Sequence, residues 1–522
     1  MVRGAAALLV FVVSVAQSLR VAPARGAVST RRRLASGTGG AVPVARTTKR
    51  DMLKFYGPAL GIFMAGPLMS NIDNAIVGRA AGVRALAALS PGTVLADQVL
   101  FLFSFLGRAT TGLVSRAYAA EGSRGARREL RRPLALAFAI GCGVLAPMYA
   151  LGTHRLLEVL RVAPDLRPDA AAYATIRGLA APLALCQSVA LSALLAARDA
   201  VTPLKVVLGA AALNLVGDWA LCIWPLRLGA AGAAAATSLS TAAGCALMLR
   251  ALRKRDFLDD DGDAGVWYRD YFFPSAPRRR AVSLAGAGRE LGPLLTYAGP
   301  LSCIVLARLL GFAAMQVTAS AYGTSALAAY QVLLNGFVLF AFFAEPLSQT
   351  AQSLIPPLLD AKQPRLLKKT MADLFVLAAA VGPLVAAAAA TFLAVGAPAF
   401  TADAATVDLV RAAAFPAVFA TVLQLTFTTT LDGCMVGARD FKWIIALGTC
   451  TCAAQLAALR IVAAKATTVH PAFGLALVFS AYTARLFAYA ALSSARVLTG
   501  YGPLGRAVKE PPPPTPPAEA RS

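Results

Sequence analysis

The chain has 522 residues, of which 58% are hydrophobic, and its mean hydropathy is +0.64. Soluble domains contain about 45–50% apolar residues, so this composition excludes an ordinary soluble protein. The net charge of +24 would suggest nucleic-acid binding in a soluble chain. Here the basic residues lie in the N-terminal tail and in short loops between apolar runs. We therefore expect a membrane protein that contacts anionic lipid head groups and has no nucleic-acid partner.

Residues 1–50 have the composition of a sorting leader, and we expect them to be disordered. Arg3 precedes a short apolar run over residues 5–15, which is the layout of a signal peptide. Residues 19–50 contain no Asp or Glu and combine Arg and Lys with Ser, Thr, Ala and Gly, which is typical of a transit peptide. This two-part leader predicts delivery to a plastid membrane. The alternative is a plain signal peptide with a basic tail, leading to another endomembrane.

Twelve apolar runs follow, each long enough to cross a hydrocarbon core roughly 30 Å thick. In chain order, we predict membrane-spanning helices over residues 53–77, 92–115, 133–152, 175–197, 203–224, 229–250, 291–317, 327–352, 371–395, 409–435, 441–462 and 471–495. The predicted fold is therefore an all-α polytopic membrane protein with an N-lobe over 51–250 and a C-lobe over 291–497. A polar linker over 251–290 joins the lobes, and the proline-rich residues 498–522 predict a disordered tail.

An internal repeat relates the two lobes. Gly82–Leu89 resembles Gly323–Tyr330, 241 positions further along the chain, and the same offset relates Ala197–Asp199 to Ala438–Asp440. An offset that holds over more than a hundred residues indicates duplication of one six-helix half. Because six is even, both halves keep the same orientation, and the repeat axis is expected along the membrane normal. Duplicated helical bundles are a common architecture of secondary transporters.

Charged side chains inside the spans are candidates for function, because a charge at mid-bilayer costs about 2.5–3.5 kcal/mol on insertion scales. Asp73 lies in the first span, and Asp218 lies in the fifth, four residues after Asn214 and on the same helix face. Two carboxylates and an amide brought together in one bundle would form a proton or cation site. The alternative is that each aspartate only forms hydrogen bonds at a helix end or between helices.

The second half carries a different set of polar groups. Glu345 lies late in the eighth span, where it begins a polar stripe that includes Gln349. Arg308 lies in the seventh span and Arg108 in the second. We consider two interpretations, namely a structural Arg308–Glu345 ion pair, or an arginine that faces a cavity and attracts an anionic substrate.

The linker contains an acidic stretch, residues 259–263, that invites comparison with the magnesium-diphosphate motifs of membrane prenyltransferases. Such a motif must line a cavity on a helix, whereas this one lies in a charged, glycine-containing loop. A solvated acidic loop is therefore the favoured interpretation. We expect a transporter without a cofactor and not an enzyme.

These residues resemble the multidrug and toxic compound extrusion (MATE) transporters over nearly all of residues 51–497. The resemblance rests on Pro67–Gly78, Ala197–Leu204, Asn214–Thr237 and Glu345–Ser353. The last segment is especially similar to the chloroplast-envelope MATE proteins of plants. The resemblance implies a two-lobed monomeric bundle that alternates its opening between the two sides of the membrane, driven by H⁺ or Na⁺.

The family's DinF-like branch implies cation coupling by Asp73, Asn214 and Asp218, with Thr237 nearby and Na⁺ as an alternative to H⁺. The other branch has an acidic residue in the seventh span, where this chain offers Arg308 and Gln316, which favours coupling in the first half. The substrate-cavity candidates are Arg108, Arg308, Gln316, Glu345 and Gln349.

The resemblance implies efflux of a small organic compound. The plant plastid relatives are linked to small aromatic carboxylates, which would suit Arg108 and Arg308. Two alternatives stay open: a lipid-linked precursor flippase of the same superfamily, and a polytopic membrane prenyl- or acyltransferase.

Overall fold

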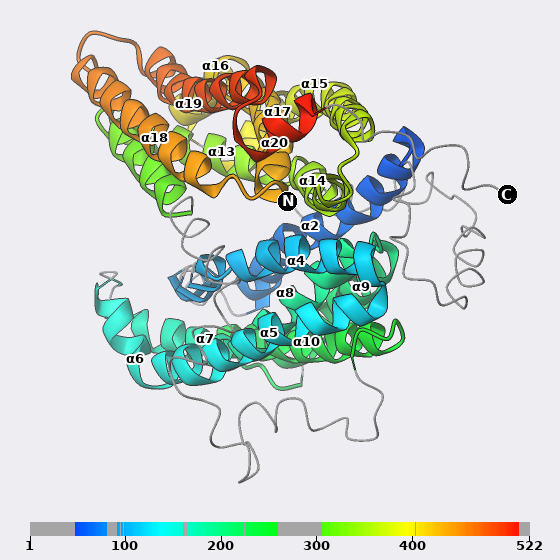
Figure 1. Cartoon of the computed structure of the whole chain (residues 1–522). Coiled ribbons are helices and arrows are strands. Elements are labelled where there is room, and N and C mark those ends of the chain that lie inside the picture. Colours follow the sequence, from blue (N-terminus) through cyan, green and yellow to red (C-terminus); the bar gives the residue numbers. More distant parts are fainter. Residues whose placement is uncertain are drawn as a thin grey trace, which may run out of the picture. The chain divides into compact units, whose positions relative to one another are not determined.

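The computed structural model describes residues 47–80, 91–93, 95–97, 99–159, 162, 164–223, 225–258, 305–401 and 403–510. Contacts divide the chain into two compact units, Met1–Ala287 and Gly288–Ser522. These described residues are almost all helical and include no strand (Figure 1). The predicted all-α fold is confirmed. Most of the predicted leader, and the acidic stretch 259–263, lie outside the described residues.

The first unit is a bundle of long helices with two short π-helical turns. Its helices are α2 (Lys49–Ala80), α4 (Phe105–Glu121), α5 (Ser123–Ile140), α6 (Ala146–Val159), α7 (Arg167–Leu179), α8 (Ala181–Ala196), α9 (Val201–Asp218) and α10 (Gly229–Arg253). The π-helical turn η2 (Gly141–Leu145) joins α5 to α6, and η3 (Trp219–Ile223) extends α9. Helix α9 packs against both α2 and α10, while α10 also packs against α7 and α8. Helices α2, α7, α9 and α10 therefore meet in one part of the unit.

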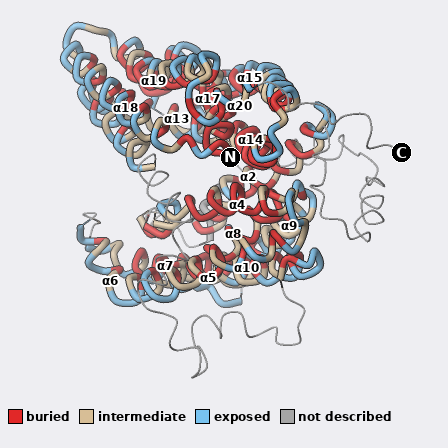
Figure 2. Tube along the Cα trace, in the orientation of Figure 1, coloured by how far each residue is buried: buried red, intermediate tan, exposed pale blue. Residues whose placement is uncertain are grey.

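The second unit begins, in its described part, with the apolar helix Val305–Ser320. It continues with α13 (Thr324–Ala341), α14 (Glu345–Asp360), α15 (Pro364–Phe400), α16 (Ala404–Ala413), η5 (Ala414–Phe419), α17 (Ala420–Gly437), α18 (Phe441–Ala464), α19 (Pro471–Thr499) and α20 (Gly502–Lys509). Helix α17 packs against α14, α15 and α19. Buried residues lie on the faces of these helices that pack together, and exposed residues lie on the outer faces (Figure 2).

Nine helical segments of the described chain are long and apolar enough to cross a membrane, and ten if α7 and α8, bent by 49°, form one span. Exposed large apolar side chains such as Leu151 and Leu384 fit this reading, because they would face lipid in a membrane. The chain is a multi-pass membrane protein.

Two boundaries differ from the sequence-based prediction. Helix α2 begins at Lys49, inside the predicted leader, because Thr48 and Asp51 form a capping box. The Thr48 hydroxyl donates to the Asp51 carboxylate over 2.7 Å, and the Asp51 amide donates back to the hydroxyl over 3.2 Å. The hydrogen bonds that the Thr48 hydroxyl and backbone N–H donate to the Asp51 carboxyl hold its pKa below its usual range.

The predicted disordered tail also starts later than expected. Helix α19 runs to Thr499 and ends at Gly500 in a left-handed conformation with φ of 87°, which a glycine adopts without strain. Helix α20 then packs against α19 and α15 and buries Leu504. The sequence-based prediction missed this short amphipathic helix because the tail as a whole is polar and rich in proline.

The internal repeat extends to backbone conformation and to ion pairs. Arg198 and Arg439, 241 positions apart, both adopt left-handed conformations, with φ of 61° and 58°. Each next residue is a buried aspartate with an arginine partner. Asp199 contacts Arg255 over 2.6 Å, and Asp440 contacts Arg496 over 2.9 Å. The two arginine partners are also separated by the repeat offset of 241 residues. Both halves therefore share the same corner, by which we mean a left-handed arginine followed by a buried aspartate that pairs with an arginine.

Candidate functional site

Helices α9 and α10 approach closely beside two of the predicted coupling residues. A Cβ on Gly217 would lie 3.0 Å from the Cβ of Ala236, so glycine lets the two backbones come together. The neighbouring Asn214 donates from Nδ2 to the Thr237 hydroxyl over 3.4 Å. That hydroxyl in turn donates to the Ala233 carbonyl over 2.8 Å. Thr237, which the resemblance implies lies near the coupling residues, is thus in direct contact with Asn214.

The two predicted aspartates lie at the same place. Asp218 is the last residue of α9, one turn after Asn214, and it is fully buried; Asp73 on α2 is 7% exposed. Their carboxyl groups are close enough to interact with each other. Among the described residues, both carboxylate oxygens of Asp218 lack a hydrogen-bond partner. The same is true of Oδ1 of Asp73. Buried carboxylate oxygens without donors are costly, so this pair is a candidate site for a proton or a cation.

The π-helical turn η3 begins directly after Asp218. A π-helical turn widens the helix locally and is frequently found at functional sites. A Cβ on Gly232 of α10 would lie 2.7 Å from the Leu221 carbonyl oxygen, so small residues of α10 also let this turn approach. The backbone around Asp218 is therefore shaped by a departure from regular helix geometry.

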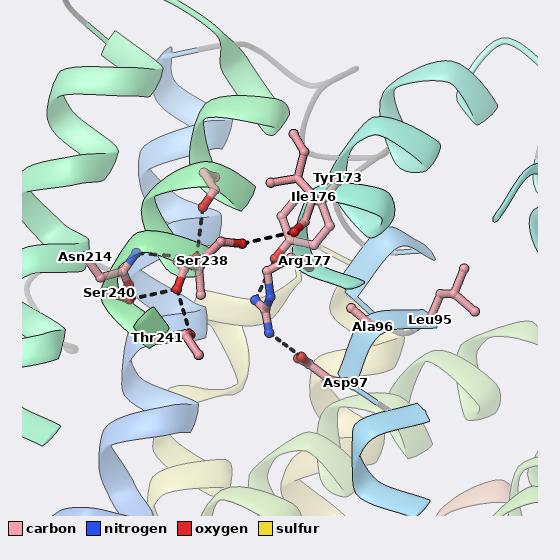
Figure 3. A network of polar contacts seen from close by, with 12 residues as sticks. Leu95, Ala96, Asp97, Tyr173, Ile176, Arg177, Asn214, Ser238, Ser240 and Thr241 are labelled. Atoms are coloured by element: carbon pink, nitrogen blue, oxygen red, sulfur yellow. Dashed lines mark hydrogen bonds and ion pairs between the residues drawn. The ribbon is translucent and has the colours of Figure 1, made fainter. Parts of the chain in front are cut away.

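An arginine that the sequence analysis did not select completes the cluster. Arg177 of α7 contacts Asp97 over 2.6 Å and donates to the Tyr173 hydroxyl over 3.2 Å (Figure 3). Its charge also interacts with Asp73. Tyr173 and Arg177 are four residues apart and share one helix face. The rule that charged residues inside spans are functional candidates would have found Arg177, but the predicted span began at residue 175 and made it look like a helix end.

Three carboxylates and one guanidinium group thus gather in the first unit. With all of them ionised, the cluster carries an excess of negative charge at low dielectric, where unlike charges attract and like charges repel strongly. Hydroxyls of α10 bond to backbone carbonyls of the same unit: Ser238 donates to the Ile176 carbonyl, and Thr241 donates to the Thr237 carbonyl (Figure 3). The carboxylate oxygens of the cluster are the type of ligand that a hard cation prefers.

The candidate substrate residues come from both units. Arg108 is half-buried on α4 in the first unit, and Gln316 is exposed on helix Val305–Ser320. Glu345 is the first residue of α14, and Gln349 is buried one turn later. Arg308 lines a cavity in the second unit, and Glu345 is not among the residues that line this cavity. The Arg308–Glu345 pairing stays a prediction.

The fold is that of a polytopic helical membrane protein with a buried carboxylate cluster in its first unit. Residues 58–220 and 300–457 match the MatE family. The chain belongs to this family, the MATE transporters, and is a membrane transporter. This assignment removes the prenyl- or acyltransferase alternative.

Two proteins of one plant are similar in sequence to this chain. "Protein DETOXIFICATION 47, chloroplastic" of Arabidopsis thaliana is 29% identical over 400 residues, which cover 76% of this chain and 69% of the relative. "Protein DETOXIFICATION 44, chloroplastic" of the same plant is 30% identical over 201 residues, which cover 36% of this chain and 38% of the relative.

Solved transporter structures share the fold at low sequence identity. A MOP superfamily transporter from Pyrococcus furiosus has a TM-score of 0.73 at 17% identity, with 91% of this chain and 100% of that chain covered. A MATE transporter from Vibrio cholerae has a TM-score of 0.73 at 16% identity, with 87% and 98% covered. At these identities the likeness establishes the arrangement of helices.

Proposed function

We propose that this transporter exports a small organic compound in exchange for H⁺ or Na⁺, and that Asp73, Asn214, Asp218 and Thr237 form the coupling site. The observation that carries the proposal is the buried pair Asp73 and Asp218, of whose four carboxylate oxygens three lack donors in the described structure. A proton or cation bound between them neutralises their repulsion. Such neutralisation stabilises the packing of α2 against α9 and α10 in one conformation of the bundle.

Coupling requires that the ion and the exported compound favour opposite-facing conformations. Each then lowers the affinity for the other, and this effect is reciprocal by thermodynamic necessity. Arg177 acts in this scheme as a fixed counter-charge, because its ion pair with Asp97 places a positive group near Asp73. Export of lipid-linked precursors, the alternative within the superfamily, uses the same coupling scheme with a larger cargo.

Replacing Asp218 with asparagine tests this proposal. Asp218→Asn keeps the shape of the side chain but removes its charge, so we expect gradient-driven efflux from proteoliposomes to fall to background. The measurement uses a panel of organic cations and organic acids, with pH and Na⁺ gradients imposed separately. Glu158→Gln is the matched control, since Glu158 is exposed and pairs with Arg167 away from the site.

A second measurement needs no knowledge of the exported compound. Trp219 directly follows Asp218, so its fluorescence should change when protons or Na⁺ bind. In the wild type we expect a saturable signal that Asp218→Asn abolishes. Undiminished gradient-driven efflux in a folded Asp218→Asn protein would reject the coupling site.

We also propose a plastid membrane as the location. The supporting observations are the two-part composition of residues 1–50 and the chloroplastic names of the plant relatives. A fluorescent fusion to residues 1–50 should enter plastids, and its retention in the secretory pathway would contradict this location.

A further inference from the structure

The Asp97–Arg177 ion pair lies beside the proposed coupling site but is more exposed than the two aspartates of that site. The side chain of Asp97 is 46% exposed, and that of Arg177 is 17% exposed. Asp73 is only 7% exposed, and Asp218 is fully buried. Because the charges of Asp97 and Arg177 both interact with Asp73, the ion pair links an exposed carboxylate to the buried pair.

The charges around Asp73 act on it in opposite directions. Among the described residues, the charged or titratable groups that interact with it include Asp218 of α9, Arg177 and Tyr173 of α7, Cys222 of η3, and Asp97. Arg177 is the cation of this set, so its charge opposes the binding of H⁺ or Na⁺ by Asp73. The negative charge of Asp97 attracts the same ion and offsets the charge of Arg177.

The guanidinium group of Arg177 is held between two neighbours (Figure 3). Its Nη2 donates to Asp97 Oδ1 over 2.6 Å, and its Nη1 donates to the Tyr173 hydroxyl over 3.2 Å. It also lies 5.9 Å from the centre of the Tyr173 ring. A charge-assisted hydrogen bond and an aromatic contact together restrict where this positive charge can lie relative to Asp73.

Tyr149 of α6 supports both partners of the ion pair. Its hydroxyl, on a fully buried side chain, donates to the Leu95 carbonyl over 3.0 Å. Its ring lies against the bare backbone of α7, because a Cβ on Gly178 would overlap with the ring. Leu95 is two residues before Asp97, and Gly178 directly follows Arg177. One tyrosine therefore contacts the backbone beside each charged residue.

We propose that Asp97 sets the affinity of the Asp73–Asp218 pair for the coupling ion by offsetting the charge of Arg177, and that Tyr149 is a positioning residue for this ion pair. The inference rests on the function proposed above, since it concerns the ion affinity of that site. A negative charge at position 97 raises the cation affinity of the buried aspartates, and a positive charge at position 177 lowers it.

Equilibrium ion titrations of the purified full-length protein in detergent test the proposal. The probes are H⁺ and Na⁺ in separate titrations, and the readout is the ion-dependent fluorescence of Trp219. Asp97→Asn should raise the ion concentration at half-maximal signal about two- to fivefold, because interactions of partly exposed charges are modest. Arg177→Gln should lower it by a similar factor, and the double variant should lie close to the wild type.

Opposite shifts and their cancellation are not expected from a general loss of packing. Asp97→Glu keeps the charge and should retain the wild-type affinity, so the test stands even if Arg177→Gln fails to fold. An unchanged affinity in folded Asp97→Asn, or shifts of the same direction in Asp97→Asn and Arg177→Gln, would overturn the proposal.

The Glu158–Arg167 ion pair provides the matched control. Arg167 lies on α7, as Arg177 does, and contacts Glu158 over 3.4 Å, with the Glu158 side chain 57% exposed. Glu158→Gln and Arg167→Gln should both leave the ion concentration at half-maximal signal unchanged. Shifts as large as those of the Asp97 and Arg177 variants would contradict a specific role of the Asp97–Arg177 pair.

Tyr149→Phe tests the positioning role. The substitution keeps the ring against Gly178 and removes only the hydroxyl, so Asp97 is held less firmly against Arg177. It should shift the ion affinity in the same direction as Asp97→Asn, by a smaller factor, and it should have no further effect in a protein that already carries Asp97→Asn. No shift in the wild-type background, or equal shifts in both backgrounds, would overturn the positioning role.

The outcome is separable from that of the coupling proposal. A wild-type signal that Asp218→Asn abolishes and Asp97→Asn leaves unchanged would refute this inference alone. A wild-type protein without a saturable ion-dependent signal would reject the coupling site itself.

Discussion

Thr237 joins α10 to the buried amide of Asn214, and its hydroxyl is the only part of the side chain that valine lacks. We expect Thr237→Val to raise the ion concentration for half-maximal efflux about two- to tenfold, since one net hydrogen bond contributes about 0.5–1.5 kcal/mol. Ion titrations in proteoliposomes measure this shift.

The control for Thr237 lies one turn along the same helix. Thr241→Val removes a hydroxyl that donates to the Thr237 carbonyl and has no other bond among the described residues. It should therefore leave ion dependence close to that of the wild type. Equal shifts in the two variants would show that Thr237 affects helix packing and not the ion site.

At the scale of single residues, the sequence was informative where a charge interrupted an apolar run. Asp73 and Asp218 stood out for this reason, and the structure places them together. Asp432 and Arg485 also lie within predicted spans but were passed over. Their partners, Tyr489 and Gln455, come from other helices, and long-range pairing of that kind leaves no local pattern in a sequence.

At the scale of secondary-structure elements, the Asp–Arg ion pairs before α9 and α18 can be compared between the two halves, because each pair stabilises the same corner. Asp440 is 6% exposed and makes two contacts with Arg496, which also lies 4.5 Å from the Trp443 ring centre. In the first unit, the arginine partner Arg255 is 40% exposed, so solvent screens its charge more strongly.

We therefore expect unequal effects from the same substitution in the two halves. Asp440→Asn should destabilise its unit by about 1–3 kcal/mol, and Asp199→Asn should cost at most about 1 kcal/mol. Thermal unfolding in detergent, followed by tryptophan fluorescence, measures both. Asp408→Asn, on the exposed face of α16, is the control, and an equal effect of all three would contradict this view.

Helix positions were predictable because apolar length is a strong signal, whereas helix ends were less so. The start of α2 depends on a reciprocal Thr48–Asp51 contact that a composition-based leader boundary overlooks. Helix α20 is short and polar on one side, so its burial of Leu504 follows only from packing against α19 and α15. The π-helical turn after Asp218 likewise depends on close packing with Gly232.

At the scale of the whole molecule, the duplication separates two kinds of chemistry. The first unit holds the carboxylate cluster, and the second holds the cavity lined by Arg308 and Arg485. The offset of 241 residues predicted the repeated helices and the Asp–Arg corners. It did not predict this division, because after duplication each copy kept its packing residues but acquired different polar groups.

This division leads to a prediction for a chain cut between its units. A protease site inserted within residues 259–287 leaves the described helices of both units intact. After cleavage in the membrane, we expect the first unit to keep the ion-dependent Trp219 signal, since all four proposed coupling residues lie in it. Gradient-driven efflux should decline, because cleavage removes the covalent connection through which we expect the two units to change conformation together. Loss of the Trp219 signal on cleavage, with the helical content unchanged, would show that the ion site depends on the second unit.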